Sequence, residues 1–149
     1  MRFNVLIGLL MLGFSYAAMS ADVKKSIHTE NAPAPIGIYS QAIRFGDTVY
    51  MSGQIGINPK TGELVSEKFK DQVRQVFENI SVVAKAAGGN MNDVLKLTIY
   101  MTDLKDFSDL NTVMAEYFEQ PYPARSAIEI KALPKKSVVE MEAVMAVGK

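Results

Sequence analysis

An arginine and a glutamate near the C-terminus are the residues best suited to chemistry. Arg125 follows Tyr122-Pro123-Ala124 and has small neighbours, which leave room around a guanidinium able to bind a carboxylate through two parallel hydrogen bonds. Glu140 lies in the apolar segment 138–143, and the alternation of a strand puts it on the same side as Glu142. A carboxylate there can orient a water and move protons. A structural Arg–Glu ion pair, or plain solvent exposure, is the alternative.

The composition excludes several other kinds of site. There is no cysteine, which excludes a disulfide, a thiolate nucleophile and a cysteine-bound metal. His28 is the only histidine, so a metal site with two histidines or a histidine acid/base pair is impossible, and we expect His28 at the surface or in a strand. Ser52 lies outside any Gly-x-Ser-x-Gly context, which argues against a Ser-His-Asp triad. Neither a metal nor a cofactor is expected.

Length and charge indicate one globular domain. The chain has 149 residues, 48% of them apolar and 21% charged, a composition that can bury a single core. Lys plus Arg balance Asp plus Glu at 16 each, and no basic stripe is present. The protein therefore offers no strong field to nucleic acid or to an anionic membrane, and neither is an expected partner.

The N-terminus resembles a secretory signal peptide. Arg2 supplies a positive start, Val5 to Phe14 is an apolar run of the right length, and cleavage could follow Ala17 or Ser20. This predicts a periplasmic or secreted protein with no membrane anchor after cleavage. If translation instead begins at Met19, the protein is cytoplasmic; a third alternative makes the segment a buried helix. The predicted division is a signal peptide over residues 1–20 and one domain over residues 21–149.

Periodicity predicts two helices. Apolar residues recur at three- and four-residue steps from Phe69 to Ala87, which indicates an amphipathic helix capped by Gly88-Gly89. A second pattern predicts a helix over 104–118, ended by Pro121 and Pro123. The other predicted segments are an extended lead-in at 27–40, a hairpin of 42–45 and 48–51 around Gly46-Asp47, a turn at 58–62, and strands at 94–101, 126–130 and 138–147.

The order of these elements, ββ-α-β-α-ββ, predicts an α+β fold. Two helices cannot cover both faces of a five- or six-stranded sheet, so both should lie on one face. In segment 94–101 we expect Leu95 to share a face with Leu97, Ile99 and Met101, opposite Val94. The uncovered face should carry apolar residues that need a partner subunit, which predicts a homo-oligomer with sites near the subunit boundary. We expect Val49, Met51, Val144 and Ala146 on that face, and Met51, Met101, Met141 and Met145 to serve packing and not metal binding.

Several motifs together resemble the RidA/YjgF family. They occur in the family's order and span about residues 27–147, nearly the whole predicted domain. The matching segments are Asn31 to Gln41, Ser52-Gly53-Gln54-Ile55, Asn58 to Glu63, Tyr122 to Ser126, Leu133-Pro134 and Val139 to Ala143.

The resemblance implies a fold, an assembly and a site. The fold would be chorismate-mutase-like, a mixed β-sheet with two helices on one face, and three subunits would close their free sheet faces into a barrel with sites between subunits. Arg125 matches the arginine that holds the substrate carboxylate, and Glu140 the glutamate that positions the attacking water. Ala127 stands where some members carry a cysteine, which water attack does not need. The further pocket positions implied are Tyr39, Ser52, Gly53 through its backbone, and Asn111.

The activity implied is that of a 2-iminobutanoate/2-iminopropanoate deaminase. Such an enzyme hydrolyses reactive enamine/imine intermediates to 2-keto acids and ammonia without a cofactor. An endoribonuclease or translation inhibitor is one alternative, and the lack of a basic stripe, of an aromatic run and of a histidine pair argues against it. A non-catalytic ligand-binding trimer is another, and the presence of both Arg125 and Glu140 argues for chemistry.

Overall fold

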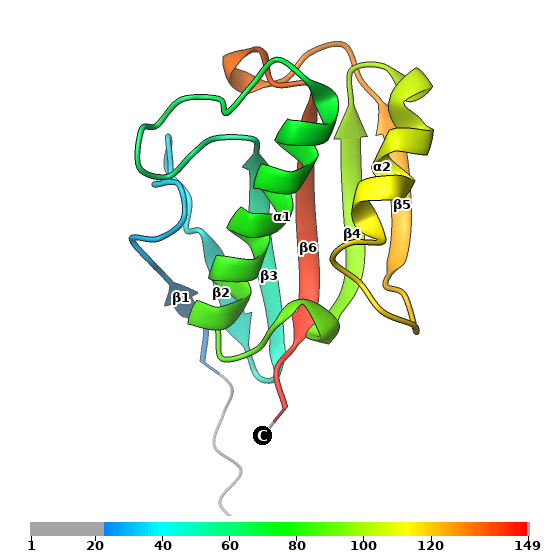
Figure 1. Cartoon of the computed structure of the whole chain (residues 1–149). Coiled ribbons are helices and arrows are strands. Elements are labelled where there is room, and N and C mark those ends of the chain that lie inside the picture. Colours follow the sequence, from blue (N-terminus) through cyan, green and yellow to red (C-terminus); the bar gives the residue numbers. More distant parts are fainter. Residues whose placement is uncertain (1–22, 149) are drawn as a thin grey trace, which may run out of the picture.

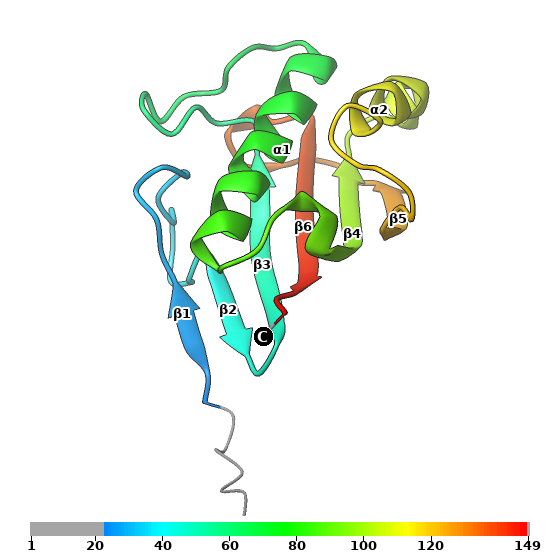
Figure 2. The same ribbon diagram turned by 60° about the horizontal axis from the view of Figure 1, so that its bottom comes forward.

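A mixed β-sheet with two helices on one face forms the part of the chain that the structure, a computed structural model, describes: residues 23–148. The strands run in the order β1-β2-β3-β6-β4-β5, and only β4 and β5 pair in parallel. Figures 1 and 2 show α1 and α2 on the same side of the sheet, which confirms the predicted α+β class. The elements are β1 (Lys25–Ile27), β2 (Ala42–Phe45), β3 (Thr48–Ile55), α1 (Phe69–Ala86), β4 (Val94–Met101), α2 (Phe107–Met114), β5 (Ala124–Glu129) and β6 (Val139–Ala146).

The predicted hairpin is present and forms two neighbouring strands of the sheet, β2 and β3. Gly46, at φ 59°, supplies the left-handed turn conformation between β2 and β3. β3 is longer than predicted and continues to Ile55, with an irregularity between Met51 and Gln54 where it pairs with β6. The lead-in is also not wholly extended coil, because Ile27 ends the short strand β1, which pairs with β2. His28 follows β1 and is exposed, as expected.

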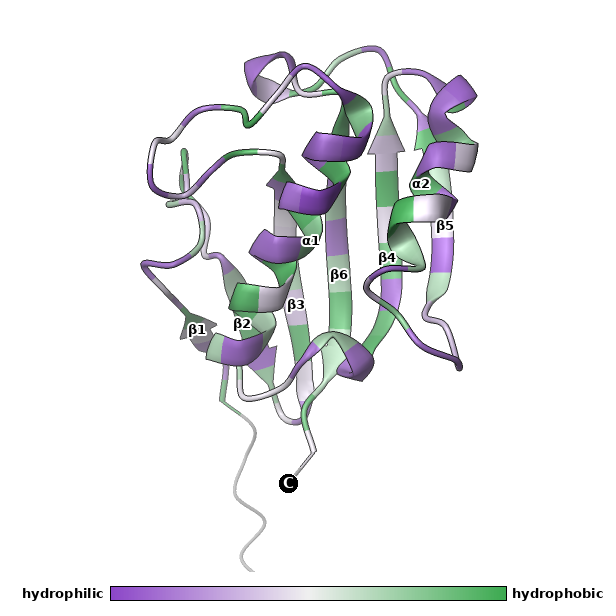
Figure 3. Ribbon diagram, in the orientation of Figure 1, coloured by the Kyte–Doolittle hydropathy of each residue, from purple (hydrophilic) through white to green (hydrophobic). Residues whose placement is uncertain are grey.

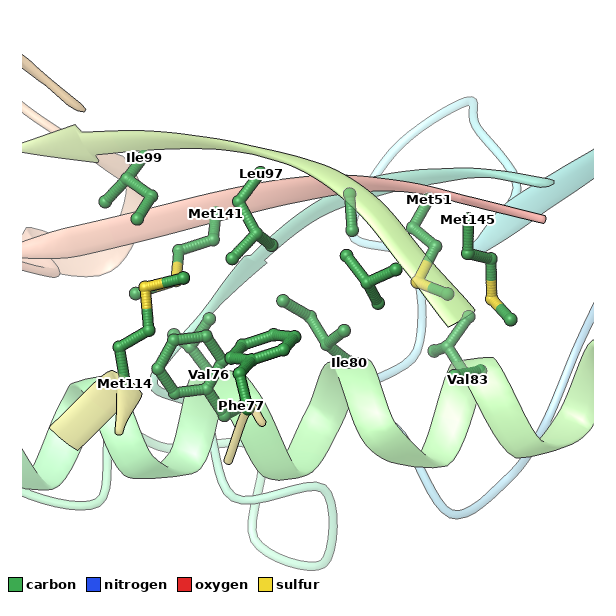
Figure 4. Close-up of a cluster of buried hydrophobic side chains, with 14 of the residues drawn as sticks. Met51, Val76, Phe77, Ile80, Val83, Leu97, Ile99, Met114, Met141 and Met145 are labelled. Carbon is green, nitrogen blue, oxygen red and sulfur yellow. The ribbon is translucent and has the colours of Figure 1, made fainter. Parts of the chain in front are cut away.

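Helix α1 packs its apolar face onto the sheet, as its periodicity predicted. The apolar side chains on this face, from Val73 to Ala84, are fully buried, and Figure 4 shows Ile80 and Val83 on the side of α1 that faces the strand methionines Met51 and Met145. Burying each such side chain stabilises the fold by roughly 1.5–3 kcal/mol. The helix ends as predicted, because Gly88 takes φ 93° and the Gly89 amide donates to the carbonyl of Ala84.

Helix α2 is shorter than predicted. A turn of 3-10 helix over Leu104–Asp106 precedes it, and the side chain of Asp103 caps that turn by accepting from the Lys105 amide at 2.9 Å. After Met114 the chain forms tighter turns, with backbone hydrogen bonds between residues three apart. Phe118 is still buried against Phe77. The apolar pattern over 104–118 therefore predicted a buried face correctly, although only part of this segment is α-helix.

Two assignments of strand faces were wrong. Val94 is buried and Leu95 is 55% exposed, because the pairing of β4 with β6 shifts register between Val94 and Lys96 and reverses the alternation there. Val49 and Met51 are also buried beneath α1 and do not lie on the uncovered face, since their partners in β6 are the buried Met145 and Ala143. The four strand methionines are all core residues, as predicted.

The face of the sheet opposite the helices carries both apolar and polar side chains. Tyr50 and Leu95 are each 55% exposed and Ile128 is 47% exposed, while Glu140 and Glu142 alternate with buried residues of β6. Figure 3 shows hydrophobic and hydrophilic residues interleaved along these strands. No helix in residues 23–148 is long and apolar enough to cross a membrane. The predicted signal peptide lies outside the described residues.

Candidate active site

Arg125 lies in a pocket between α2 and the edge strand β5. The pocket, called here the arginine pocket, has a volume of about 400 Å³. Arg125 is the second residue of β5 and pairs with the buried Leu97 of β4, so its side chain is directed to the helix side of the sheet. The lining residues are Asn111, Met114, Ala115, Tyr122, Pro123 and Arg125.

The guanidinium of Arg125 is held by neutral groups. Its Nη1 donates to Oδ1 of Asn111 at 2.7 Å and contacts the sulfur of Met114 at 3.4 Å. The Phe107 ring lies below it, 4.9 Å from the guanidinium carbon, a geometry that favours a cation. Within residues 23–148 no carboxylate lies at ion-pair distance from Arg125. The alternative of an Arg125–Glu140 ion pair is therefore wrong within one described chain, and a positive charge remains available to a ligand.

Glu140 lies in a second pocket, called here the glutamate pocket, on the face opposite the helices. Its neighbours Val139 and Met141 are buried in the core, which directs Glu140 away from the helices. The pocket has a volume of about 420 Å³ and combines apolar walls with two carboxylates. Its lining residues are Ile36, Tyr39, Ser52, Gly53, Ile55, Pro134, Glu140 and Glu142.

The carboxyl group of Glu140 is half-buried on the backbone of Gly53. A β-carbon built at residue 53 would overlap the Glu140 carboxylate and lie 2.9 Å from its Cδ, so any side chain there would displace the carboxyl group from this position. Burial raises the pKa of Glu140, and the nearby negative charge of Glu142 raises the pKa further. A carboxyl group of this kind is suited to exchanging protons nearer neutral pH than an exposed one.

Tyr39 and Ser52 shape the glutamate pocket through hydrogen bonds to the preceding loop. The Tyr39 hydroxyl accepts from the Ile36 amide at 3.1 Å, and Oγ of Ser52 donates to the Ser40 carbonyl at 2.7 Å. Buried Gln41 anchors the same loop, since its side-chain amide donates to the carbonyls of Thr29 and Pro33. The Ser52 hydroxyl thus donates its proton to a backbone carbonyl, which gives it a structural role in holding this loop.

Sequence reasoning missed several residues that border the two pockets. Tyr100 pairs with Glu140 across β4 and β6, and burial followed by the charges of Glu142 and Glu140 raises the pKa of its hydroxyl. Met114 and Phe107 contact Arg125, although their sequence signal was only that of an apolar helix face. The alternation in β6 had already placed Glu142 beside Glu140.

One chain divides the six predicted site residues between the two pockets. Arg125 and Asn111 border the arginine pocket; Tyr39, Ser52, Gly53 and Glu140 border the glutamate pocket, and no lining residue is shared. Arg125 is directed to the helix side of β5 and Glu140 to the opposite side of β6, with β4 between the two strands. β5, the strand that carries Arg125, is at the edge of the sheet.

The described residues show no metal centre. In residues 23–148 no group of three or more His, Asp or Glu side chains is placed to hold an ion.

Comparison with known proteins assigns the chain to a family. The family model described as Endoribonuclease L-PSP matches residues 29–147. A RutC family protein of Pyrococcus horikoshii is 52% identical over 122 residues, covering 82% of this chain and 97% of that protein. A protein of Dermatophagoides farinae named 2-iminobutanoate/2-iminopropanoate deaminase is 44% identical over 124 residues, covering 83% of this chain and 97% of that protein. The crystal structure of RidA from an Antarctic Psychrobacter superposes with a TM-score of 0.81 at 50% identity, covering 83% of this chain and 99% of that one. The chain therefore belongs to the Endoribonuclease L-PSP family, the RidA/YjgF family that its sequence motifs resemble.

Proposed function

We propose that this protein hydrolyses 2-imino acids such as 2-iminopropanoate and 2-iminobutanoate to 2-keto acids and ammonia. The observation that carries the proposal is Arg125, whose guanidinium is oriented by Asn111 and Phe107 and has no carboxylate partner in the described chain. A substrate carboxylate would supply the ionic partner of this guanidinium. The deaminase names of relatives such as the D. farinae protein support the same reaction.

The proposed site lies between subunits of a homotrimer. Arg125 and Glu140 are directed to opposite faces of the sheet, and both pockets are open to solvent in a single chain. The face that bears Glu140 also exposes Tyr50, Leu95 and Ile128, apolar surface of the kind that partner subunits cover. Three copies arranged around an axis would bring the arginine pocket of each copy to the glutamate pocket of the next.

The proposed mechanism uses only side chains and water. Arg125 binds the substrate carboxylate and so places the C=N carbon near a water held by Glu140. The water oxygen adds to the carbon of the protonated imine while Glu140 accepts a water proton. Glu140 then returns this proton to the nitrogen and, as the C–N bond breaks, takes the hydroxyl proton of the carbinolamine, which gives a 2-keto acid and ammonia. Transfer of that proton from Glu140 to the ammonia restores the carboxylate. Free imines already react with water, so positioning would supply most of the acceleration.

Ammonia release tests the proposal directly. Imino acids are generated in place from amino acids by an amino-acid oxidase, and their decay is followed with and without the purified protein. Faster loss of the imine with stoichiometric ammonia supports the proposal, and an unchanged rate contradicts it. An RNA substrate in a parallel reaction tests the endoribonuclease alternative.

Export is a second proposal, made from the sequence of residues 1–20. We propose that these residues are a cleaved leader and that residues 21–149 form the mature domain in the periplasm or outside the cell. Intact-mass analysis of protein from its native host should show a new N-terminus between Ala18 and Asp22 in the exported fraction. A cytoplasmic product that begins at Met19 or Ser20 would contradict export.

A further inference from the structure

A buried glutamine in the first turn of α1 makes side-chain hydrogen bonds to residues that lie outside both the helices and the strands. Gln72 is 1% exposed. Its Oε1 accepts from the hydroxyl of Ser137 at 2.8 Å and from the amide of Val138 at 3.0 Å. Its Nε2 donates to the carbonyl of Ser66 at 2.8 Å. One side chain thus joins α1 to the segment that starts β6, and Figure 1 shows these two segments at the same end of the molecule.

The segment held by Gln72 begins with an unusual turn. The Ser137 amide donates to the Pro134 carbonyl at 3.0 Å, and the two residues between them, Lys135 and Lys136, have φ of 53° and 60°. In the described part of the chain they are the only residues other than glycine with positive φ. A turn with positive φ at both central positions normally carries glycine or asparagine. Such a conformation persists where surrounding contacts impose it, and it often accompanies function.

Both ends of this segment border the glutamate pocket. Pro134 lines the pocket just before the two lysines, and Glu140 lines it two residues after Val138. The carboxyl group of Glu140 lies directly on the backbone of Gly53, so a shift at the start of β6 would change this contact. On the other side, α1 lies so close to Gly56 that a β-carbon there would come within 2.8 Å of Cα of Gln72. The backbone at Gln72 is therefore held close to the segment that follows β3.

We propose that Gln72 is a positioning residue for the glutamate pocket, holding the start of β6 so that Pro134 and the carboxyl group of Glu140 stay fixed against Gly53. The proposal rests on the function proposed above, in which Glu140 orients the attacking water. Gln72 touches no substrate; it acts through Ser137 and Val138.

The variant Gln72→Met tests this, because methionine keeps the length and bulk of the side chain but cannot hydrogen-bond to Ser137 and Val138. We expect the assembled protein to keep its mass and KM while kcat falls by about ten- to a hundredfold. The carboxyl pKa of Glu140, followed by carbon-13 NMR, should move down toward its ordinary value, since a displaced carboxyl group gains solvent. The titratable groups that face it, Glu142 on β6, Tyr100 on β4 and Tyr39 in the preceding loop, are unchanged.

A matched control separates positioning from stability. Ile80→Val trims a fully buried residue of the same helix and should lower Tm without changing kcat or the pKa of Glu140. If Gln72→Met does not fold, Ser137→Ala removes the hydroxyl that donates to Gln72 and to the Val139 carbonyl but keeps the bond from the Val138 amide, and it should cause smaller changes in the same direction. Wild-type kcat and an unchanged Glu140 pKa in either folded variant would overturn the proposal. A wild-type protein without activity on imines contradicts the proposed function instead, and the NMR titration still decides whether Gln72 positions Glu140.

Discussion

At the scale of single residues, the sharpest prediction concerns the fork geometry of Arg125. Arg125→Lys keeps the charge but cannot form two parallel hydrogen bonds to a carboxylate. We expect kcat/KM to fall about 30- to 1000-fold, equivalent to roughly 2–4 kcal/mol of lost transition-state binding. Folding should survive, since the only strong polar partner of Arg125 in the described chain is Asn111.

The matched control for Arg125→Lys is Arg74→Lys. Arg74 of α1 makes a bidentate contact with Glu116, just after α2, at 2.8 and 3.0 Å, on the surface and outside both pockets. Arg74→Lys should leave turnover unchanged and change Tm little, because exposed ion pairs contribute little to stability. Wild-type turnover in an assembled Arg125→Lys variant would end the assignment of this arginine to substrate binding.

A second residue-scale prediction concerns pH. The negative charge of Glu142 helps to raise the pKa of Glu140, so Glu142→Gln should lower it. If Glu140 works as a carboxylate, activity is lost as pH falls through its pKa, and the acidic limb of the kcat/KM profile should therefore move to lower pH. Glu116→Gln, remote from this pocket, should leave the limb in place. A limb that stays or rises in Glu142→Gln would show that another group controls the profile.

At the scale of elements, the close approach of α1 to the segment after β3 is the critical packing contact. A β-carbon at Gly56 would lie 2.8 Å from backbone atoms of Gln72, which cannot rotate away. Gly56→Ala should therefore cost about 1–3 kcal/mol of unfolding free energy, measured by urea denaturation. Gly148→Ala places its methyl group in open space and should change stability little. Equal midpoints for the two variants would contradict this packing.

The elements also show what the sequence can predict. Local periodicity was enough to predict α1, and the Gly46-Asp47 turn was enough to predict the β2–β3 hairpin. The face of Leu95 was mispredicted because a bulge depends on the register between β4 and β6, which no local pattern encodes. The chemistry of Arg125 and Glu140 is visible in their residue types, but their division between two pockets follows from strand order. Gln72 was missed because a buried amide in a helix pattern gives no signal until its distant partners are known.

At the scale of the whole molecule, subunit mixing tests the proposed assembly. Light scattering should give three times the mass of one chain, and a monomer at micromolar concentration would contradict an intersubunit site. Mixing the variants Arg125→Lys and Glu140→Gln under conditions that exchange subunits should restore activity, because some sites then combine an intact arginine with an intact glutamate. Random exchange predicts roughly one quarter of wild-type sites. No recovery, despite proven exchange, would place both residues in one chain's site.

The position of β6 has a consequence for how the protein is made. β6 is the last strand in the chain, yet it lies inside the sheet between β3 and β4, where Thr48 pairs with Ala146. While the C-terminal residues are still inside the ribosome, β3 and β4 have no neighbour to join them, so the sheet cannot close during synthesis. Pairings between such distant parts of a chain also form slowly. The newborn polypeptide should thus hold β1–β3 and the β4–β5 pair as two separate parts until β6 has left the ribosome and joins them.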